Sequence, residues 1–202
     1  IENGHQIGIF DSIPTEANTL AYSSDMKIVA AGYERKIVLW NSESKEQIGI
    51  IEEHPCGPGL DSDECQITAL AVSADKERII SGGGGKIVVW DASNQNQIGI
   101  FEDVSAAIHS MVLSPNGKNL VSINWNNITM LDIENMEKIG TIDELACGIA
   151  SVPLGCGVSA ITFAPDGKIF AAAGRDNKVY LWDAETLNKV SELNGHGFAV
   201  ND

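Results

Sequence analysis

Short apolar runs recur along the whole chain, separated by polar and turn-forming residues. Three of these runs end in tryptophan, at residues 36–40 (KIVLW), 86–90 (KIVVW) and 178–182 (KVYLW). A fourth run, 127–131 (NITML), has the same character but ends in leucine. Runs of about 4–8 residues that are rich in Val, Ile and aromatic side chains are typical of strands. The pattern therefore predicts a series of repeated β-strands.

A second apolar signal, usually an Ile-Gly pair, follows each of these runs. It begins at Ile7, Ile48, Ile98 and Ile139, and it returns as Val-Ser at Val190. Successive copies are 41, 50, 41 and 51 residues apart, so alternate repeats carry an extra nine or ten residues. A period of this size is typical of repeat architectures. We infer that the natural unit is a pair of repeats.

Each repeat contains four predicted strands. In the last repeat these are residues 158–163, 168–173, 178–182 and about 188–193. The turn at 164–167 (APDG) separates the first two, because Pro fixes φ and Gly supplies a positive φ. A similar turn recurs at 114–117 (SPNG). Strands joined by turns every ~8–12 residues predict an all-β array.

Taken together, the four-stranded units, the Trp-Asp endings and the SPDG-like turns resemble the WD-repeat family of β-propellers. The resemblance covers essentially the whole chain, and it implies an all-β propeller in a single segment, 1–202. We expect four complete four-stranded antiparallel blades, at residues 17–51, 66–101, 107–142 and 158–193. Residues 1–10 would be the outer strand of a preceding blade, and 194–202 the start of a following one. Another antiparallel β array is the alternative fold.

Four blades are fewer than the usual ring of this family. Open edges at both ends of such an array would be prone to pairing. We therefore expect the sequence to be part of a larger ring, and the two-repeat period favours six or eight blades. Assembly from several copies of the chain is the alternative.

Members of the family often tie a blade with a hydrogen-bonded His, Ser or Thr, Asp and Trp. No blade here has the whole set: Gly84 stands where Asp is expected beside Trp90, and the blade of Asp176 lacks the His. The missing polar partners predict weaker coupling between blades. The resemblance assigns structural roles to five residues: Trp40, Trp90, Trp182, His54 and His196.

The two insertions contain all four cysteines. Cys56 and Cys65 are nine residues apart, and Cys147 and Cys156 repeat that spacing. A disulfide in each loop, Cys56–Cys65 and Cys147–Cys156, is the favoured interpretation, and it would imply an oxidising compartment. Free thiols and a metal site are alternatives. No Cys-x-x-Cys motif supports a metal site, and only the first loop has a nearby His, His54.

Charge limits the possible partners. The chain has 28 acidic and 13 basic side chains, and its net charge is -15. A phosphate-binding surface needs clustered Lys and Arg, so nucleic acid is excluded as a partner. No run approaches the ~18 apolar residues of a membrane span, so we expect no membrane insertion. The acidic charge favours a protein partner with a neutral or basic surface.

The sequence shows no recognisable catalytic motif. There is no P-loop, no G-x-S-x-G and no H-E-x-x-H. Gly82–Gly85 resembles a phosphate loop, but it joins two strands and lacks the Lys-Ser/Thr of that motif. We therefore expect a non-catalytic protein with no cofactor and no metal.

By the family topology, both cysteine loops and the turns between second and third strands share one face. Exposing a large aromatic residue in a loop is costly unless it packs or binds a partner, and Trp125 is such a residue. Folding back of Trp125 over a neighbouring blade is an equal alternative. The residues expected to bind a partner on this face are Tyr33, Glu34, Trp125, Arg175 and Asp176.

The resulting functional hypothesis is a protein-interaction or scaffold propeller, part of a larger extracellular or cell-surface assembly. Its partners would be proteins, further copies of the chain or further blades. One alternative is a cytoplasmic sensor or scaffold propeller within a signalling protein. Another is an enzyme or carbohydrate-binding propeller with chemistry in its central channel, for which the sequence offers only His109.

Overall fold

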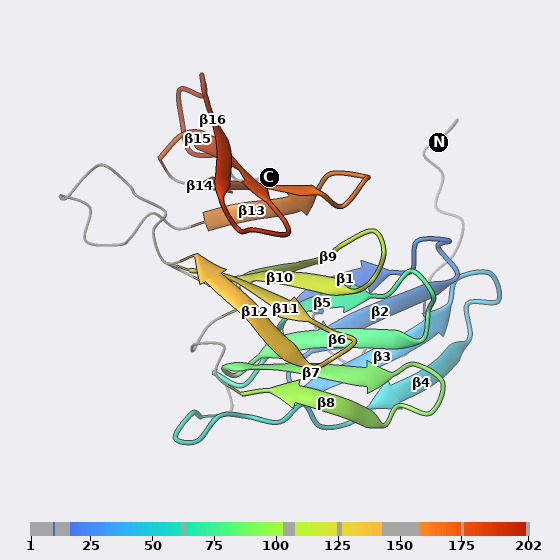
Figure 1. The fold of residues 1–202 in the computed structure, drawn as a ribbon. Helices are drawn as coiled ribbons and strands as arrows, with labels where there is room; N and C mark the ends of the chain where they lie inside the picture. Colours follow the sequence, from blue (N-terminus) through green and yellow to red (C-terminus); the bar gives the residue numbers. More distant parts are fainter. Residues whose placement is uncertain are drawn as a thin grey trace.

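The computed structural model describes residues 10, 17–61, 64–102, 108–124, 127–142, 158–174 and 176–200. Within these ranges the chain forms sixteen strands and no helix. The strands make four four-stranded antiparallel sheets, each in simple up-and-down order. This confirms the prediction of an all-β propeller with four four-stranded blades (Figure 1). Of the expected outer strand at 1–10, only Phe10 is among the described residues.

The blades are numbered 1 to 4 along the chain, and their strands are as follows. Blade 1 contains β1 (Thr19–Tyr22), β2 (Ile28–Tyr33), β3 (Lys36–Asn41) and β4 (Gln47–Ile51). Blade 2 contains β5 (Ile67–Val72), β6 (Arg78–Gly83), β7 (Lys86–Asp91) and β8 (Gln97–Phe101). Blade 3 contains β9 (Ser110–Leu113), β10 (Asn119–Ile123), β11 (Ile128–Asp132) and β12 (Glu137–Ile142). Blade 4 contains β13 (Val158–Phe163), β14 (Ile169–Gly174), β15 (Lys178–Asp183) and β16 (Lys189–Asn194).

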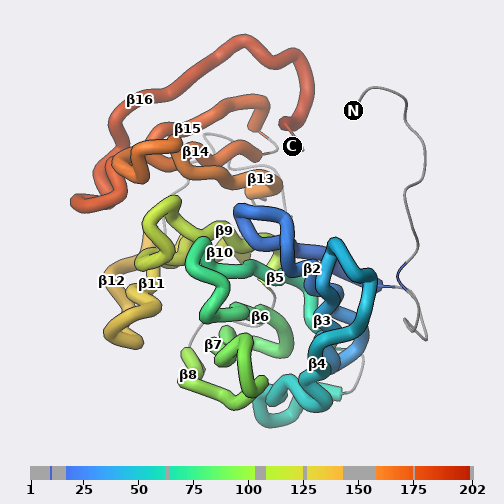
Figure 2. The backbone as a smooth tube through the Cα atoms, turned by 90° about the vertical axis from the view of Figure 1, so that its right-hand side faces the viewer, coloured from blue at the N-terminus to red at the C-terminus, as the bar shows by residue number. Residues whose placement is uncertain are grey.

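Successive blades meet through their first strands. β1 contacts β5, β5 contacts β9, and β9 contacts β13. In Figure 2 these strands lie near the middle of the molecule, while β4, β8, β12 and β16 lie at the periphery. The segment between β4 and β5, of which the structure describes all but residues 62–63, therefore leads from the periphery back to the centre.

The acidic or amide residue that ends each third strand fixes the turn that follows. The Asp91 Oδ1 atom accepts the Ser93 N–H at 2.8 Å, and Asp183 Oδ1 accepts the Thr186 N–H at the same distance. Asn41 and Asp132 hold their turns in the same way. Short side-chain oxygens that accept a backbone N–H two or three residues on are typical turn formers. This local bond explains the Asp of the Trp-Asp endings.

The two faces of the central strands pack against different neighbours. In blade 2, Val88 and Trp90 face blade 1, whereas Ile87 and Val89 face blade 3. Fully burying one such aliphatic side chain contributes about 1.5–3 kcal/mol. The strands are therefore buried on both faces, which accounts for their continuous apolar sequence.

The Ile-Gly signal marks close approach between blades at the periphery. In blades 1 to 3, a Cβ atom built on the glycine of the fourth strand would lie within 3 Å of a side chain from the next blade. The three pairs are Gly49 with Gln95 (2.9 Å), Gly99 with Met136 (2.5 Å) and Gly140 with Leu187 (2.6 Å). Gln95, Met136 and Leu187 all have positive φ in the turn before the fourth strand. Blade 4 has Ser191 at the glycine position.

Candidate interaction face

The segment between β4 and β5 lies against the turns of two blades. Its described residues 55–61 and 64–66 are called the cysteine loop below. The His54 N–H donates to the Arg35 carbonyl at 2.7 Å, and the Ile67 N–H donates to the Glu34 carbonyl at 2.6 Å. Within the loop, the Gly57 N–H donates to the carbonyl of Gly84 at 3.0 Å. The loop therefore joins the β2–β3 turn of blade 1 to the β6–β7 turn of blade 2.

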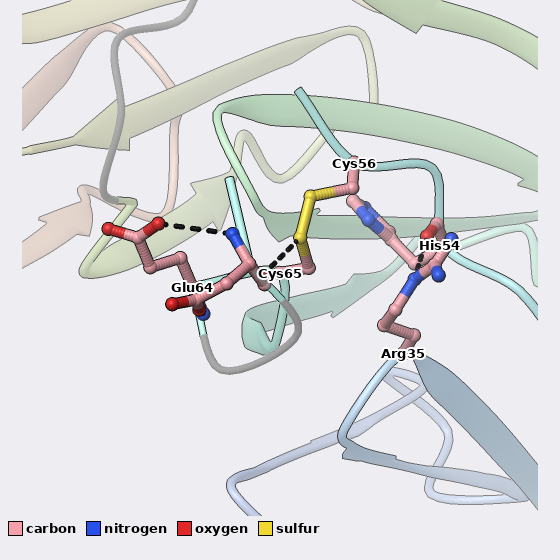
Figure 3. The surroundings of a disulfide bond; sticks show 6 residues. Arg35, His54, Cys56, Glu64 and Cys65 are labelled. Carbon is pink, nitrogen blue, oxygen red and sulfur yellow. Dashed lines mark hydrogen bonds between the residues drawn. A yellow bond between two sulfur atoms is a disulfide. The ribbon is translucent and has the colours of Figure 1, made fainter. Parts of the chain in front are cut away.

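A disulfide closes the cysteine loop. Cys56 and Cys65 are bonded, with 5.4 Å between their Cα atoms (Figure 3). Cys65 is 3% exposed, whereas Cys56 is half-buried. The first of the two expected disulfides is therefore present. The second, Cys147–Cys156, lies outside the described residues.

The disulfide packs directly on the turn of blade 2. A Cβ atom built on Gly84 would lie 3.3 Å from the Cys65 Cα and 3.5 Å from the Cys56 Sγ. Gly84 also has a φ of 55°, a conformation that L side chains adopt only with strain. Both constraints select glycine here, and they explain why no Asp stands at this position.

His54 directly precedes the cysteine loop and is completely buried. Its Nε2 atom donates to the Ser81 carbonyl at 3.5 Å, while Nδ1 has no hydrogen-bond partner among the described residues. The Trp90 Nε1–H donates to the Ser81 Oγ at 2.7 Å. His54, Ser81 and Trp90 therefore form a packed polar set without a carboxylate, as the sequence predicts.

Burial also determines the charge of His54. Desolvation lowers the pKa of the imidazole from 6.5 to about 4, and the positive charges of Arg35 and Lys86 act in the same direction. At neutral pH the ring is therefore uncharged, as expected for a structural histidine in an apolar site. Arg35 also donates its Nε–H to the His54 carbonyl at 2.9 Å, which holds the backbone on both sides of the ring.

The exposed side chains around the cysteine loop are mainly acidic. Lys36 pairs with Glu52 at 2.8 Å, and Lys86 pairs with Glu102 at 3.3 Å. The hydrogen bond that Lys36 donates to the Glu52 carboxylate raises the pKa of Lys36. Four further carboxylates are exposed on this face: Glu34, Glu53, Asp61 and Glu64. The face is therefore suited to a partner with basic groups.

The expected binding residues occupy different environments. Tyr33 is 4% exposed and packs with Val38 and Trp40, whereas its neighbour Glu34 is exposed. Asp176 is half-buried, and its Oδ2 atom accepts the Tyr180 hydroxyl at 2.6 Å. Trp125 and Arg175 lie outside the described residues. Within the described part, the face therefore consists of the Glu34–Arg35 turn and the cysteine loop.

Of the five residues expected to have structural roles, four are buried and one is exposed. Trp40, Trp90 and Trp182 are all buried in the cores between blades or at their edge, as is His54. His196 is exposed. The tryptophans therefore act as packing residues, which is the role that the repeat pattern indicates.

Two residues that shape this face could not be recognised from the sequence. Arg35 organises the start of the cysteine loop through a backbone carbonyl, and no motif marks such a contact. Tyr180 supplies the hydroxyl that holds Asp176, and its desolvation and the Asp176 carboxylate raise its pKa. In the sequence Tyr180 is one apolar residue of a strand. Its polar role becomes visible only when the turn is folded.

Features of other kinds of site are few in the described part of the chain. No three of its His, Cys, Asp or Glu side chains are grouped so as to hold a metal ion. None of its segments forms a helix with the length and apolar character to cross a membrane. His109 lies just before β9, is exposed, and donates its backbone N–H to the Ile123 carbonyl at 2.9 Å.

The repeat pattern matches a known protein family. The family model described as "WD domain, G-beta repeat" matches residues 48–91 and 153–183. The chain therefore contains repeats of the WD family. The first match runs from β4 through β7, and the second ends with Trp182 and Asp183 at the end of β15. A search of curated proteins found no match. WD-repeat proteins are generally non-catalytic scaffolds, and the matched repeats indicate a protein-interaction scaffold propeller.

Proposed function

We propose that this WD-repeat chain binds its protein partners through the face formed by the cysteine loop and the Glu34–Arg35 turn. The supporting observation is that a disulfide fixes the loop across the turns of two blades. A fixed loop loses little conformational entropy when it binds, and this favours affinity. The exposed carboxylates of Glu34, Glu53 and Glu64 select partners with basic or neutral surfaces.

We also propose an extracellular or cell-surface location. The Cys56–Cys65 disulfide supports it, since structural disulfides persist in oxidising compartments and are rare in the cytosol. The equal spacing of Cys147 and Cys156 supports a second disulfide in the corresponding loop. Trp125 and Arg175 remain proposed contact residues on the same face.

Blade 4 supports the proposal of a larger assembly. Leu193 on β16 is 49% exposed, whereas its counterparts Ile51, Phe101 and Ile142 are buried at 8% or less. The same face of blade 4 contains an apolar cavity of about 240 Å³ beside Val200. Exposed apolar surface of this kind is typical of an interaction site. We propose that a further blade covers this face in the working protein.

Carbodiimide cross-linking in the native environment tests the binding proposal even while the partner is unidentified. The reagent joins carboxylates to partner lysines, and mass spectrometry then maps the linked peptides. Cross-links to other proteins should concentrate on Glu34, Glu53 and Glu64. They should disappear when these three residues are replaced by Gln.

A matched control replaces three exposed carboxylates of the opposite turns: Glu43, Glu46 and Glu185. This triple Gln variant should retain the intermolecular cross-links. Cross-links spread equally over both sets of carboxylates would contradict the proposed face. The alternative functions, a cytoplasmic sensor and a channel-centred enzyme, place no partner contacts specifically on the cysteine loop.

A further inference from the structure

We propose that Asn127, in the turn between β10 and β11, carries an N-linked oligosaccharide. The proposal rests on the proposed extracellular or cell-surface location, because this modification is made in the secretory pathway. Residues 127–129 (NIT) form an Asn-x-Thr acceptor sequence, and no other Asn-x-Ser/Thr stretch occurs in the 202 residues. Three observations on blade 3 support the site: the strand register, the hydrogen bonds of the turn and the burial of the threonine.

The strand register places Asn127 where the other blades have a lysine (Figure 1). The first apolar residue of each third strand pairs with the same position of the second strand: the pairs are Ile37–Gly32, Ile87–Gly82, Ile128–Ile123 and Val179–Ala173. The residue before it is Asn127 in blade 3, and Lys36, Lys86 or Lys178 in the other blades. Each lysine reaches a carboxylate, in the pairs Lys36–Glu52, Lys86–Glu102 and Lys178–Glu192. The side chains of Lys36 and Lys178 are 37% and 38% exposed, so an oligosaccharide that follows the same direction from Asn127 extends into solvent.

The turn that holds Asn127 uses its backbone. The Asn127 N–H donates to the Asn124 Oδ1 atom at 2.8 Å, and the Asn124 N–H donates to the Asn127 carbonyl at 3.1 Å. Neither bond involves the Nδ2 atom to which a sugar is attached. Asn127 is half-buried, as are the three lysines at the corresponding positions. The folded turn therefore keeps both hydrogen bonds when Nδ2 is modified.

Thr129 places a hydroxyl at a buried position of β11. It is 6% exposed, and its counterparts Val38 and Val88 are fully apolar and equally buried, while blade 4 has Tyr180 there. A buried hydroxyl is costly unless it is hydrogen-bonded, so packing favours Val at this position. Blade 3 thus departs from the repeat at both acceptor positions, with Asn in place of Lys and Thr in place of Val. An acceptor sequence requires both changes together.

Attachment of the oligosaccharide precedes folding of blade 3. The acceptor sequence is read through both Asn127 and Thr129, and Thr129 is buried once β11 has formed. The donor is an oligosaccharide linked to a lipid through a diphosphate. The Asn127 Nδ2 atom attacks the anomeric carbon of the first sugar, the bond between that carbon and the diphosphate oxygen breaks, and Nδ2 loses a proton. The lipid diphosphate is the leaving group, and nothing is oxidised or reduced.

Glycosidase treatment of the native protein tests the proposal directly. The protein is taken from its natural source, digested, and treated with a peptide N-glycosidase in heavy-oxygen water, which converts a glycosylated Asn to an Asp that carries the heavy isotope. Mass spectrometry should find this label at Asn127 in most molecules. An unmodified Asn127 in protein whose Cys56–Cys65 disulfide is intact would overturn the oligosaccharide and leave the proposed location standing. An unmodified Asn127 together with free Cys56 and Cys65 would overturn both.

Two substitutions of Thr129 separate the acceptor sequence from the fold. Thr129→Val restores the residue of blades 1 and 2, whereas Thr129→Ser keeps the acceptor sequence. Produced in the secretory pathway of cultured eukaryotic cells, the wild type and Thr129→Ser should lose the mass of one oligosaccharide on glycosidase treatment, and Thr129→Val should lose none. Asn127→Lys, which restores the lysine of the other blades, gives the same readout if Thr129→Val does not fold. No oligosaccharide on the wild type, or one that persists in Thr129→Val or Asn127→Lys, would overturn the assignment. The carboxylate cross-links of the cysteine-loop face should persist in every variant, so a failure of the binding proposal appears separately in that experiment.

Discussion

The indole N–H groups of the recurring tryptophans lie in different polar environments. Trp90 donates its Nε1–H to the Ser81 Oγ, whereas the buried Nε1 of Trp182 has no partner in the part of the chain that the structure describes. The residue of blade 4 that corresponds to Ser81 is Ala172, which lies two positions beyond the partner of Trp182 in strand β14. An unsatisfied buried donor costs about 1–3 kcal/mol. One missing hydroxyl therefore weakens the packing of blade 4.

Replacing Ala172 by Ser should stabilise the chain. The new hydroxyl would accept the Trp182 Nε1–H, and we expect the free energy of unfolding in urea to rise by about 0.5–1.5 kcal/mol. The reverse change, Ser81→Ala, leaves the Trp90 donor buried and should lower it by about 1–3 kcal/mol. If Ala172→Ser were as destabilising as Ser81→Ala, the proposed correspondence between the two blades would be wrong.

His54 should make stability depend on pH. Its folded-state pKa of about 4 lies below the ordinary value of 6.5, so between these values the unfolded chain binds a proton that the folded chain does not. The contribution of His54 to the free energy of unfolding is therefore fully present above pH 6.5, and it is lost as the pH falls toward 4. From pH 7 to pH 5 the imidazole should reduce the free energy of unfolding by about 2 kcal/mol.

The measurement is urea unfolding at pH 7 and pH 5 for the wild type and for His54→Gln. His109, whose pKa is also lowered by burial, is present in both proteins, so its contribution cancels in the comparison. The variant should show the smaller change with pH. A pH dependence identical in both proteins would show that His54 does not ionise on unfolding in this range.

At the level of elements, the four-strand repeat could be predicted because its signals are local. Turn formers such as Asp91 bond to backbone groups two or three residues away, and the four central residues of a buried strand such as β7 are all apolar. The contact between Arg35 and the His54 carbonyl was not predictable, since it joins residues 19 positions apart through the backbone. The burial of Tyr33 was also missed, because its position beside a turn indicated exposure.

The cysteine loop offers a prediction about stability. Cys56→Ala/Cys65→Ala removes a cross-link that restricts a short loop in the unfolded chain, and this should lower the free energy of unfolding by about 2–3 kcal/mol. Chemical denaturation of the oxidised protein measures it. The matched control, Cys147→Ala/Cys156→Ala, tests whether the second loop contributes equally. No loss of stability in the first variant would mean that the loop is held by its other contacts.

At the scale of the whole molecule, blade 3 is covered by a following blade within the described chain, whereas the outer face of blade 4 is exposed. Ile142 of blade 3 is buried against blade 4, whereas the corresponding Leu193 of blade 4 is half-exposed. In the chain 1–202, Ile142→Ala should cost about 2–5 kcal/mol and Leu193→Ala less than about 1 kcal/mol. Urea unfolding of both variants checks the difference. Equal losses would show that the face of blade 4 is already covered.

The repeat length and the open edges of the array could both be inferred from the sequence. The geometry of the disulfide-closed loop could not. Spacing shows that the Cys56 and Cys65 pair is repeated at Cys147 and Cys156, yet it does not show that the first loop joins the turns of two blades. Those contacts depend on how blades 1 and 2 are placed relative to each other. This placement is also what gives the proposed interaction face its fixed shape.

The thiol state of the native protein tests the central claim most directly. The protein is taken from its natural source, alkylated with iodoacetamide without reductant, digested and analysed by mass spectrometry. The account predicts a linked peptide pair joining Cys56 to Cys65, with no alkyl group on either residue. Alkylated Cys56 and Cys65 in the native protein would contradict both the fixed interaction face and the proposed oxidising location.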